Sequence, residues 1–297
     1  MRRGLYEPGG FYTTQEPRRH FDTSSRSPLF ARAIAALARE VDARLQRPQR
    51  FTLVDMGAGS GELLHNLLDV DDLDGRLELV GVDVRPRPPL DPRIEWRHDP
   101  PGDIVGMVVA CEWLDNVPLD VAVRDDHGRA RLQLVDPVNG ETAPGPAVDA
   151  PQQRWLDTWW PHGRVAEIGL ARDRAWASLT RRLRRGCALA VDYGHTAADR
   201  PSAGTLTGYL EGKQTEPIPD GSRDITAHVA FDSLGPGSIT TQDKALRSLG
   251  IDGTRPNLEL ARNDPSAYLG RLSTASEAAR LTDRGGLGRH LWLRHDK

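Results

Sequence analysis

A strand that runs directly into a glycine-rich turn constrains the fold of this 297-residue chain more than any other stretch. Residues 51–54 (FTLV) are apolar and predict a buried strand, which Asp55 closes. Gly57, Gly59 and Gly61 follow at alternate positions, and a helix with apolar residues at helical spacing begins inside the turn. Glycine suits such a turn because it adopts positive φ and lets a ligand approach the backbone. The layout predicts a nucleotide-type cofactor site in an open α/β sheet.

The charges around this turn indicate which cofactor it binds. A dinucleotide fingerprint would need a third glycine at position 62, where the chain has Glu62. The Asp55 carboxylate would repel a pyrophosphate but suits a ligand with an amino group and a sulfonium, which points to S-adenosylmethionine. Asp83 ends the next strand about 20 residues beyond the last glycine, where ribose hydroxyls are bound in this fold class. We expect these cofactor residues: Asp55, Gly57, Ala58, Gly59, Gly61, Asp83, Val84 and Asp99.

Two further strands also end in acidic residues. The apolar stretch 104–110 leads through Cys111 into Glu112 and Asp115, and the strand 187–191 ends in Asp192 and Tyr193. Acids at the carboxyl ends of such strands lie where ligands bind. Glu112 and Asp115 are three residues apart, so on a tight turn they face the same way. Either both grip a substrate nitrogen, or Glu112 binds cofactor and Asp115 caps the next turn.

Composition excludes several classes of protein. A net charge of −3 argues against a nucleic-acid binder. Cys111 and Cys187 each fall in an expected core strand and read as buried thiols of a reducing compartment, and no spacing indicates a zinc site, so we expect no metal. No apolar run is long enough for a membrane span, and the start of the chain lacks an apolar leader segment. We expect a cytoplasmic protein.

The remaining stretches predict one domain with additions. Tyr6, Phe11, Tyr12 and Phe21 give residues 1–28 more aromatics than a flexible arm needs, and we expect this arm to cover the cofactor mouth. Residues 29–297 then form the main domain, with inserted substrate-binding segments at about 119–165 and 196–235. Other expected elements are a hairpin at 119–135, a loop at 139–151, a helix at 171–185, an irregular loop at 196–226 and a final edge strand at 291–293.

An ordered set of blocks resembles the MidA family of S-adenosylmethionine-dependent methyltransferases. The blocks are LYEPGGFYTT (5–14), HFDTSSRSPLF (20–30), LVDMGAGSGEL (53–63), ACEWLDNVP (110–118), DYG (192–194), GTLTGYLEGK (204–213), DITAHVAFDSL (224–234) and TQDKALRSLGI (241–251). The family includes bacterial members and a mitochondrial complex I assembly factor that methylates protein arginine. The chain departs from the family at Cys111, where the motif has Asn, and at Asp83, where many members have Glu.

The resemblance implies a Rossmann-like class I methyltransferase with a mostly parallel twisted sheet and helices on both faces. It also implies that Thr23 and Ser24 contact the cofactor carboxylate. The expected function is methylation of a protein arginine, with a respiratory complex I subunit as a candidate. The alternatives are a small-molecule N- or O-methyltransferase and a non-catalytic assembly factor, and a homodimer is left open.

The residues at the strand ends and in the block at 224–234 have expected roles in catalysis and substrate binding. The catalytic residues are Glu112, Asp115 and His228, with Glu112 also on the cofactor. His228 either accepts a proton or makes a structural hydrogen bond. The substrate wall consists of Asp115, Asp192, Tyr193 and Asp224.

Overall fold

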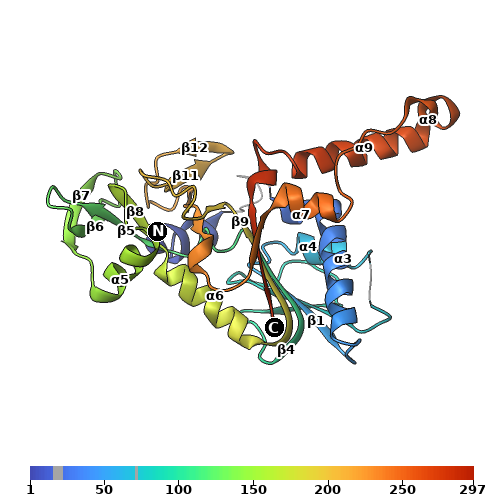
Figure 1. Cartoon of the computed structure of the whole chain (residues 1–297), viewed down its shortest axis with the longest axis horizontal. Coiled ribbons are helices and arrows are strands. Elements are labelled where there is room, and N and C mark those ends of the chain that lie inside the picture. The colour runs from blue at the N-terminus through green and yellow to red at the C-terminus, as the bar shows by residue number, and fades with distance from the viewer. Residues whose placement is uncertain (16–22, 71–72) are drawn as a thin grey trace. The chain divides into compact units, whose positions relative to one another are not determined.

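The structure is a computed structural model that describes residues 1–15, 23–70 and 73–297. The chain divides into two compact units. Figure 1 shows the whole chain coloured by residue number, so each unit contains several colours. The sheet unit comprises residues 23–111, 182–191 and 237–297, and the insert unit comprises residues 1–22, 112–181 and 192–236. His20, Phe21 and Asp22 of the resemblance block at 20–30 lie outside the described residues.

The sheet unit is built on a seven-stranded sheet in the order β15-β16-β9-β4-β1-β2-β3. Neighbouring strands from β9 to β3 are parallel, whereas β15 and β16 pair antiparallel. The expected α/β fold with a mostly parallel sheet is confirmed. Its strands are β1 (Phe51–Met56), β2 (Leu77–Val82), β3 (Ile94–Arg97), β4 (Ile104–Cys111), β9 (Leu183–Asp192), β15 (Ser238–Thr241) and β16 (Leu291–Asp296).

Helix α3 (Pro28–Arg44) packs its apolar stripe into the core of this unit. The Ser27 hydroxyl accepts a hydrogen bond from the Leu29 amide at 3.2 Å, and Pro28 occupies the first helical position, so both residues fix the start of the helix. The other helical elements of the unit are η2 (Ser24–Arg26), α4 (Glu62–Leu67), α7 (Gln242–Ser248), α8 (Leu258–Asn263), α9 (Pro265–Leu281) and η4 (Leu287–Arg289).

Two expectations about the sheet unit are wrong. Residues 291–293 are not an edge strand, because β15 pairs with the outer side of β16. The helix expected to run to Arg185 ends at Arg182, and β9 begins at Leu183 opposite Ile104 of β4. Pairing with a neighbouring strand overrides the helical preference of the arginine-rich stretch.

The insert unit contains three small sheets, in the orders β7-β6-β5-β8, β12-β11-β13 and β10-β14. Their strands are β5 (Asp120–Arg124), β6 (Ala130–Val135), β7 (Thr142–Ala147), β8 (Val165–Ile168), β10 (Gly194–His195), β11 (Thr207–Leu210), β12 (Lys213–Thr215), β13 (Asp224–Thr226) and β14 (Val229–Ala230). The helical elements are α1 (Arg2–Tyr6), α2 (Phe11–Thr14), α5 (Ala150–Trp159), α6 (Leu170–Arg182) and η3 (Phe231–Ser233).

The hairpin of β5 and β6 is confirmed, but the loop expected at 139–151 is wrong. Its first part is β7, which carries Pro144 and Pro146. An edge strand tolerates proline because one side of it needs no ladder hydrogen bonds, and β7 is the edge of its sheet. The last residues of the expected loop belong to the start of α5, where Asp149 forms a capping box with Gln152.

The segment expected to be an irregular loop at 196–226 contains β11, β12 and β13. Each of these strands has only three or four residues, which is too short for a periodic pattern to emerge from the sequence. Ile225 of β13 is buried with Leu5 and Phe11 of the N-terminal helices, so α1 and α2 pack on this small sheet. Among the described residues, no helix combines the length and the apolar character that a membrane crossing needs.

Candidate active site

The glycine turn of the sheet unit has the backbone that its sequence predicts. Gly57, Gly59 and Gly61 all have positive φ, at 75°, 62° and 80°. The amides of Gly57 and Ala58 donate to the Val82 carbonyl at 2.9 and 3.1 Å, which joins the turn to the end of β2. A Cβ atom at position 61 would lie 2.7 Å from a Leu90 methyl group, which would have to move, but it is the positive φ that favours glycine here.

Asp55 lies at the end of β1, buried to 4% exposure. Burial, followed by the nearby charges of Asp83 and Glu62, raises the pKa of its carboxyl to about 7. A cationic ligand at this turn would favour the charged form of Asp55. The residues present therefore fit a cofactor that carries an amino group and a sulfonium.

Asp83 follows β2 and already has two partners within the unit. Its Oδ2 accepts from the Gly59 amide at 2.9 Å, and its Oδ1 accepts from the Arg85 amide at 2.9 Å and from Arg85 Nε at 3.2 Å. These bonds hold the carboxylate beside the glycine turn. Oδ1 already accepts two hydrogen bonds, whereas Oδ2 accepts one and keeps a second lone pair for a hydroxyl donor.

The other expected cofactor residues of the sheet unit differ in their exposure and in their hydrogen-bond partners. Val84 is 66% exposed, and Asp99 is exposed just beyond β3, the strand next to β2. Thr23 Oγ1 lies 2.8 Å from Ser25 Oγ. Ser24 is fully buried, and its Oγ accepts from Nε2 of the buried Gln242 at 3.0 Å.

Glu112 and Asp115 stand in the loop that directly follows β4. Glu112 is half-buried and has φ 52°, a left-handed conformation that is uncommon outside glycine. Asp115 is buried, its Oδ1 accepts from Asn116 Nδ2 at 2.9 Å, and its Oδ2 accepts from Thr226 Oγ1 at 2.7 Å. The Asp115 carboxylate thus bonds one side chain of its own loop and one of β13. A strained non-glycine residue at this position is typical of a functional loop.

Asp192 holds this loop in place from the end of β9. Its Oδ2 accepts from the amides of Leu114 and Asp115 at 3.0 and 3.1 Å, and its Oδ1 accepts from the Tyr193 amide at 2.9 Å. Burial raises the pKa of Asp192, and the charges of Asp115 and Glu112 raise it as well. Both loop acids therefore act on the same carboxyl group, so the structure brings Glu112, Asp115 and Asp192 together.

Asp224 belongs to the same acidic cluster. It lies on β13 at 3% exposure, and its Oδ1 accepts from the Tyr12 hydroxyl at 3.1 Å. Burial raises the pKa of Asp224 to about 7, and the charge of Asp115 contributes. Thr226, two residues on and so on the same side of the strand, donates to Asp115. A second tyrosine of the N-terminal segment, Tyr6, donates to the Asn116 carbonyl at 3.1 Å and stacks on Tyr12.

His228 and Tyr193 form one side of this cluster. Their rings stack with centroids 6.1 Å apart, because β10 and β14 pair in parallel directly after them and the Val229 amide donates to the Tyr193 carbonyl. Burial, followed by the charge of Glu112, raises the pKa of Tyr193. The His228 amide donates to Thr205 Oγ1 at 2.8 Å.

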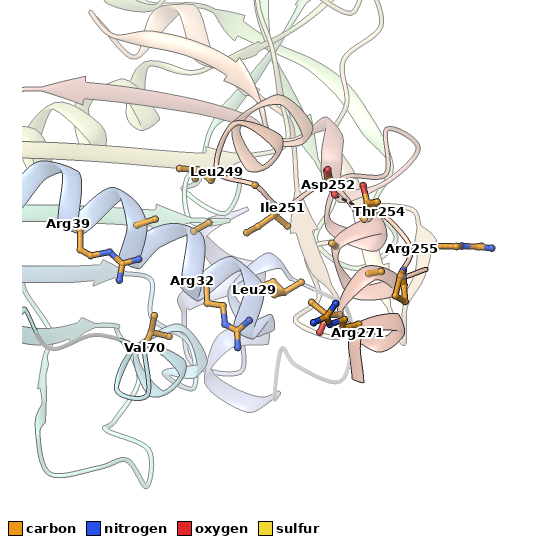
Figure 2. A pocket seen from close by; sticks show the side chains of 18 residues that line it. Leu29, Arg32, Arg39, Val70, Leu249, Ile251, Asp252, Thr254, Arg255 and Arg271 are labelled. Carbon is orange, nitrogen blue, oxygen red and sulfur yellow. Dashed lines mark hydrogen bonds between the residues drawn. The ribbon is translucent and has the colours of Figure 1, made fainter. Parts of the chain in front are cut away.

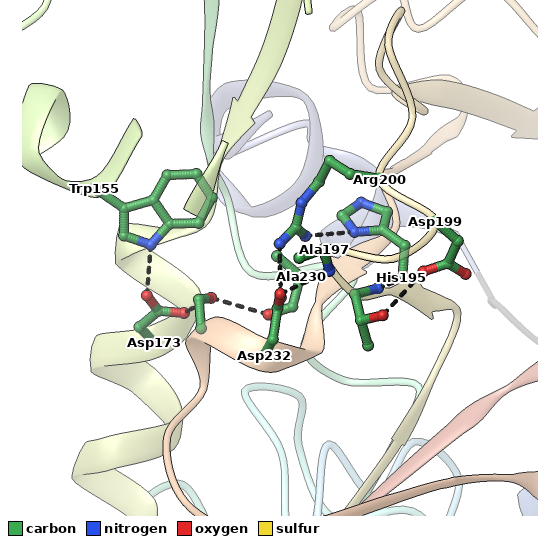
Figure 3. A network of polar contacts seen from close by, with 10 residues as sticks. Trp155, Asp173, His195, Ala197, Asp199, Arg200, Ala230 and Asp232 are labelled. Carbon is green, nitrogen blue, oxygen red and sulfur yellow. Dashed lines mark hydrogen bonds and ion pairs between the residues drawn. The ribbon is translucent and has the colours of Figure 1, made fainter. Parts of the chain in front are cut away.

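A polar network surrounds Ala230 of β14 and the following η3 (Figure 3). Arg200 bonds both oxygens of Asp232 in η3 at 2.7 and 2.8 Å and lies 2.7 Å from Nδ1 of His195. Burial and the charge of Arg200 lower the pKa of His195 to about 3, so His195 is neutral at physiological pH. On the other side, Asp173 of α6 accepts from Trp155 Nε1 and from Ser233 Oγ, both at 2.6 Å.

Arg172 of α6 is the main connection between the two segments that carry the acidic cluster. It is 1% exposed, and its guanidinium donates to the carbonyls of Asp115 and Val117 in one segment and of Ala227 and His228 in the other. Burial lowers the pKa of Arg172, whereas the charges of Asp115 and Asp192 oppose that shift. Nothing in the sequence pointed to Arg172, since it lies on a polar helix among other arginines.

Glu167 of β8 has a comparable role for the segment before β11. Its carboxylate accepts from the amides of Thr205 and Leu206 and, at 2.8 Å, from the Thr205 hydroxyl. Thr205 in turn accepts from the His228 amide. Sequence reasoning missed Glu167, Thr205, Tyr12 and Thr226 as well, and only Thr226, by its spacing from Asp224, carried a usable signal.

The acidic cluster is not arranged for a metal ion. Within the described residues, no group of three or more His, Cys, Asp or Glu side chains could hold one. Both cysteines are buried and free, as expected. A site of this kind can bind and orient a cation by charge and by hydrogen bonds to carboxylate oxygens.

Comparisons with known proteins agree with this geometry. A family model described as "Putative S-adenosyl-L-methionine-dependent methyltransferase" matches residues 29–251, three quarters of the chain. The solved structure of a protein from Burkholderia thailandensis bound to S-adenosyl-homocysteine is 25% identical, with a TM-score of 0.82 over 100% of this chain and 86% of that one. The native structure of an uncharacterized protein of the same superfamily and organism is also 25% identical, with a TM-score of 0.79 over 100% and 85%.

No curated protein matches the chain. The family model and the likeness to a structure that holds the demethylated cofactor identify S-adenosylmethionine as the cofactor, in agreement with the buried carboxylate of Asp55 at the glycine turn. When bound, this cofactor supplies a methyl group on a sulfonium. The chain belongs to this family of S-adenosyl-L-methionine-dependent methyltransferases.

Proposed function

We propose that the enzyme methylates an arginine side chain of a protein substrate. The observation that carries the proposal is the charge balance of the acidic cluster in the insert unit. Asp115, Asp192 and Asp224 are at most 5% exposed, and Glu112 is half-buried beside them. The buried cation that acts on Asp115 and Asp192 is Arg172, whose donors bind backbone carbonyls. Carboxylates that remain in excess inside a protein favour a cationic ligand.

A guanidinium is the cation whose methylation needs such a cluster. Its lone pairs are delocalised and it stays protonated, so it is a poor nucleophile. Carboxylates on either side localise the charge on one nitrogen and orient another toward the methyl carbon. We assign this grip to Glu112 and Asp115, with Asp192 holding their loop and Tyr193 and Asp224 completing the wall. His228 or Asp224, whose pKa is about 7, then accepts the proton that the methylated nitrogen releases.

For the cofactor, we propose Asp55, the three turn glycines, Ala58 and Asp83 as direct contacts. Val84, Asp99, Thr23 and Ser24 remain proposed contacts, of which Ser24 is engaged with Gln242. That the N-terminal arm covers the cofactor stays a prediction. Its test is the S-adenosylmethionine affinity of a chain without residues 1–25, measured by calorimetry, and an unchanged affinity would contradict it.

The acceptor class is tested by incubating the enzyme with methyl-labelled S-adenosylmethionine and a cell lysate. The proposal expects label in the protein fraction, with a respiratory complex I subunit as one candidate band. Label confined to small molecules would contradict it and favour a biosynthetic N- or O-methyltransferase. No transfer to any fraction, with normal cofactor binding, would favour a non-catalytic assembly factor. Cell fractionation and light scattering test the cytoplasmic location and the homodimer.

The buried carboxyl of Asp224 makes a separate prediction about stability. Its pKa is about 7 in the folded protein against about 3.9 in an unfolded chain. The folded state therefore holds more protons between pH 4 and 7, and stability falls as pH rises through this window. Asp224→Asn should raise the free energy of unfolding by about 2 kcal/mol at pH 8 and change it little at pH 4, while it lowers turnover.

Denaturant unfolding at both pH values checks this expectation. Asp220→Asn is the matched control, since Asp220 lies in an exposed turn of the same segment and bonds Ser222 and Arg223. That control should be neutral or slightly destabilising. Equal stability of Asp224→Asn and the wild type at pH 8 would show that burial of the ionised Asp224 carboxylate does not destabilise the fold.

A further inference from the structure

A groove in the sheet unit lies apart from every residue proposed for cofactor or substrate. Its cavity has a volume of about 740 Å³ and lies between α3, the segment 249–256 and α9 (Figure 2). A volume of this order lies within the usual range for binding sites, roughly 300–1,000 Å³.

Each of the two helices contributes one face to this groove. The residues repeat at intervals of three and four, which places them on a single stripe of each helix. On α3 they are Leu29, Arg32, Ala33, Ala36 and Arg39, and on α9 they are Arg271, Thr274, Ala275 and Ala278. At the floor Ala36 is half-buried, as are Val70, Leu249 and Ile251, while Ala33, Ala275 and Ala278 lie buried beneath. The small side chains let a further helix approach closely.

The rim of the groove is positively charged. Arg32 and Arg39 stand on α3 and Arg271 on α9, as Figure 2 shows, and Arg255 lies on the connecting segment. All four are exposed, and within the described residues no hydrogen bond or ion pair joins Arg32, Arg255 or Arg271 to a partner. The one acid in the lining, Asp252, uses Oδ1 to accept from the Thr254 amide. The charges of Arg32, Arg255 and Arg271 are therefore left for a ligand.

We propose that this groove is a docking site for an acidic amphipathic helix of a partner protein. The apolar face of the helix would lie on the alanine floor, and its acids would meet the arginines of the rim. Arg32 and Arg39 are seven residues apart, about 10.5 Å along α3, so acids seven residues apart on the docked helix match them. The rim arginines are exposed, so binding weakens as salt rises.

Selection from a displayed library of helical peptides tests the proposal on the full-length enzyme. The expected enriched peptides carry an apolar stripe flanked by Asp or Glu seven residues apart. Arg32→Glu with Arg271→Glu should weaken their binding at least tenfold. The matched control is Arg184→Glu with Arg262→Glu, two exposed arginines outside the groove, which should leave affinity within twofold. Ala36→Trp, which fills the groove without a charge change, should also abolish binding.

Several outcomes would overturn the proposal. Enrichment of peptides without acids, or equal binding to both charge-reversed variants, would show that the groove does not select an acidic helix. Saturable binding of dodecyl phosphate that displaces the peptides would identify a lipid-like anion as the occupant. A dimer in solution that Ala36→Trp converts to monomers would identify a second copy of the chain. Thermal melting and S-adenosylmethionine affinity confirm that each variant is folded.

Discussion

Replacing Glu112 with glutamine should lower kcat about 10²- to 10³-fold while S-adenosylmethionine affinity changes little. Glutamine keeps the shape of the side chain but removes the negative charge that the proposed grip uses, and removal of one charge-stabilising group costs about this much. The half-buried position of Glu112 beside Asp115 and Asp192 makes its charge effective, because fewer water molecules screen it. Turnover is measured with saturating cofactor on the labelled protein substrate, and cofactor affinity by calorimetry.

This experiment distinguishes the two roles considered for Glu112, which are the grip on the substrate and the binding of the cofactor. If Glu112 serves only the cofactor, affinity falls and turnover recovers at high cofactor concentration. Full turnover with normal affinity would show that Glu112 has no part in the grip. Glu141→Gln is the matched control, because Glu141 is an exposed residue of the same unit, and it should leave both quantities unchanged.

Replacing Arg172 with alanine should destabilise the protein by about 3–5 kcal/mol, because the buried carboxyls of Asp115 and Asp192 would lose the buried cation whose charge acts on them. The carbonyls of Asp115, Val117, Ala227 and His228 would lose their donor at the same time. Those groups belong to the two segments that carry the acidic cluster, so the loss of order there should also raise KM. Denaturant unfolding measures the first effect and steady-state kinetics the second.

Two further variants serve as comparisons for the stability of Arg172→Ala. Arg172→Lys keeps the charge but loses the planar fork of donors, so its stability should fall between wild type and alanine. Arg174→Ala, an exposed position two residues along α6, should change stability by no more than about 0.5 kcal/mol. An Arg172→Ala variant within about 1 kcal/mol of the wild type would show that Arg172 does not hold the two segments together.

The sequence carried strong signals for the sheet unit. The central strands β1 and β4 are buried on both faces and read as apolar runs, and acids mark where they end. β1, the turn and α4 could therefore be predicted from residues 51–68 alone. β15 and the true position of β16 could not, because a four-residue strand has no pattern of its own and is defined by its neighbour.

The acidic cluster was predictable only in part. Glu112, Asp115 and Asp192 could be predicted as site residues because they stand at the ends of core strands. Asp224 and His228 were placed by the family resemblance rather than by any pattern. The roles of Arg172 and Glu167 could not be predicted, because the sequence does not distinguish a buried charged residue from an exposed one. Only the surrounding fold does so. The tyrosine that bonds Asp224 comes from position 12, and contacts of that sequence separation leave no trace in a single sequence.

The most direct test of this account is the chemical identity of the methylated group. Protein labelled by the wild-type enzyme and methyl-labelled S-adenosylmethionine is hydrolysed to amino acids and resolved by chromatography with mass spectrometry. The account predicts that the label co-elutes with methylarginine and that Glu112→Gln removes that peak. Label on lysine, on a carboxyl group or on another side chain would contradict the assignment of the acidic cluster to a guanidinium.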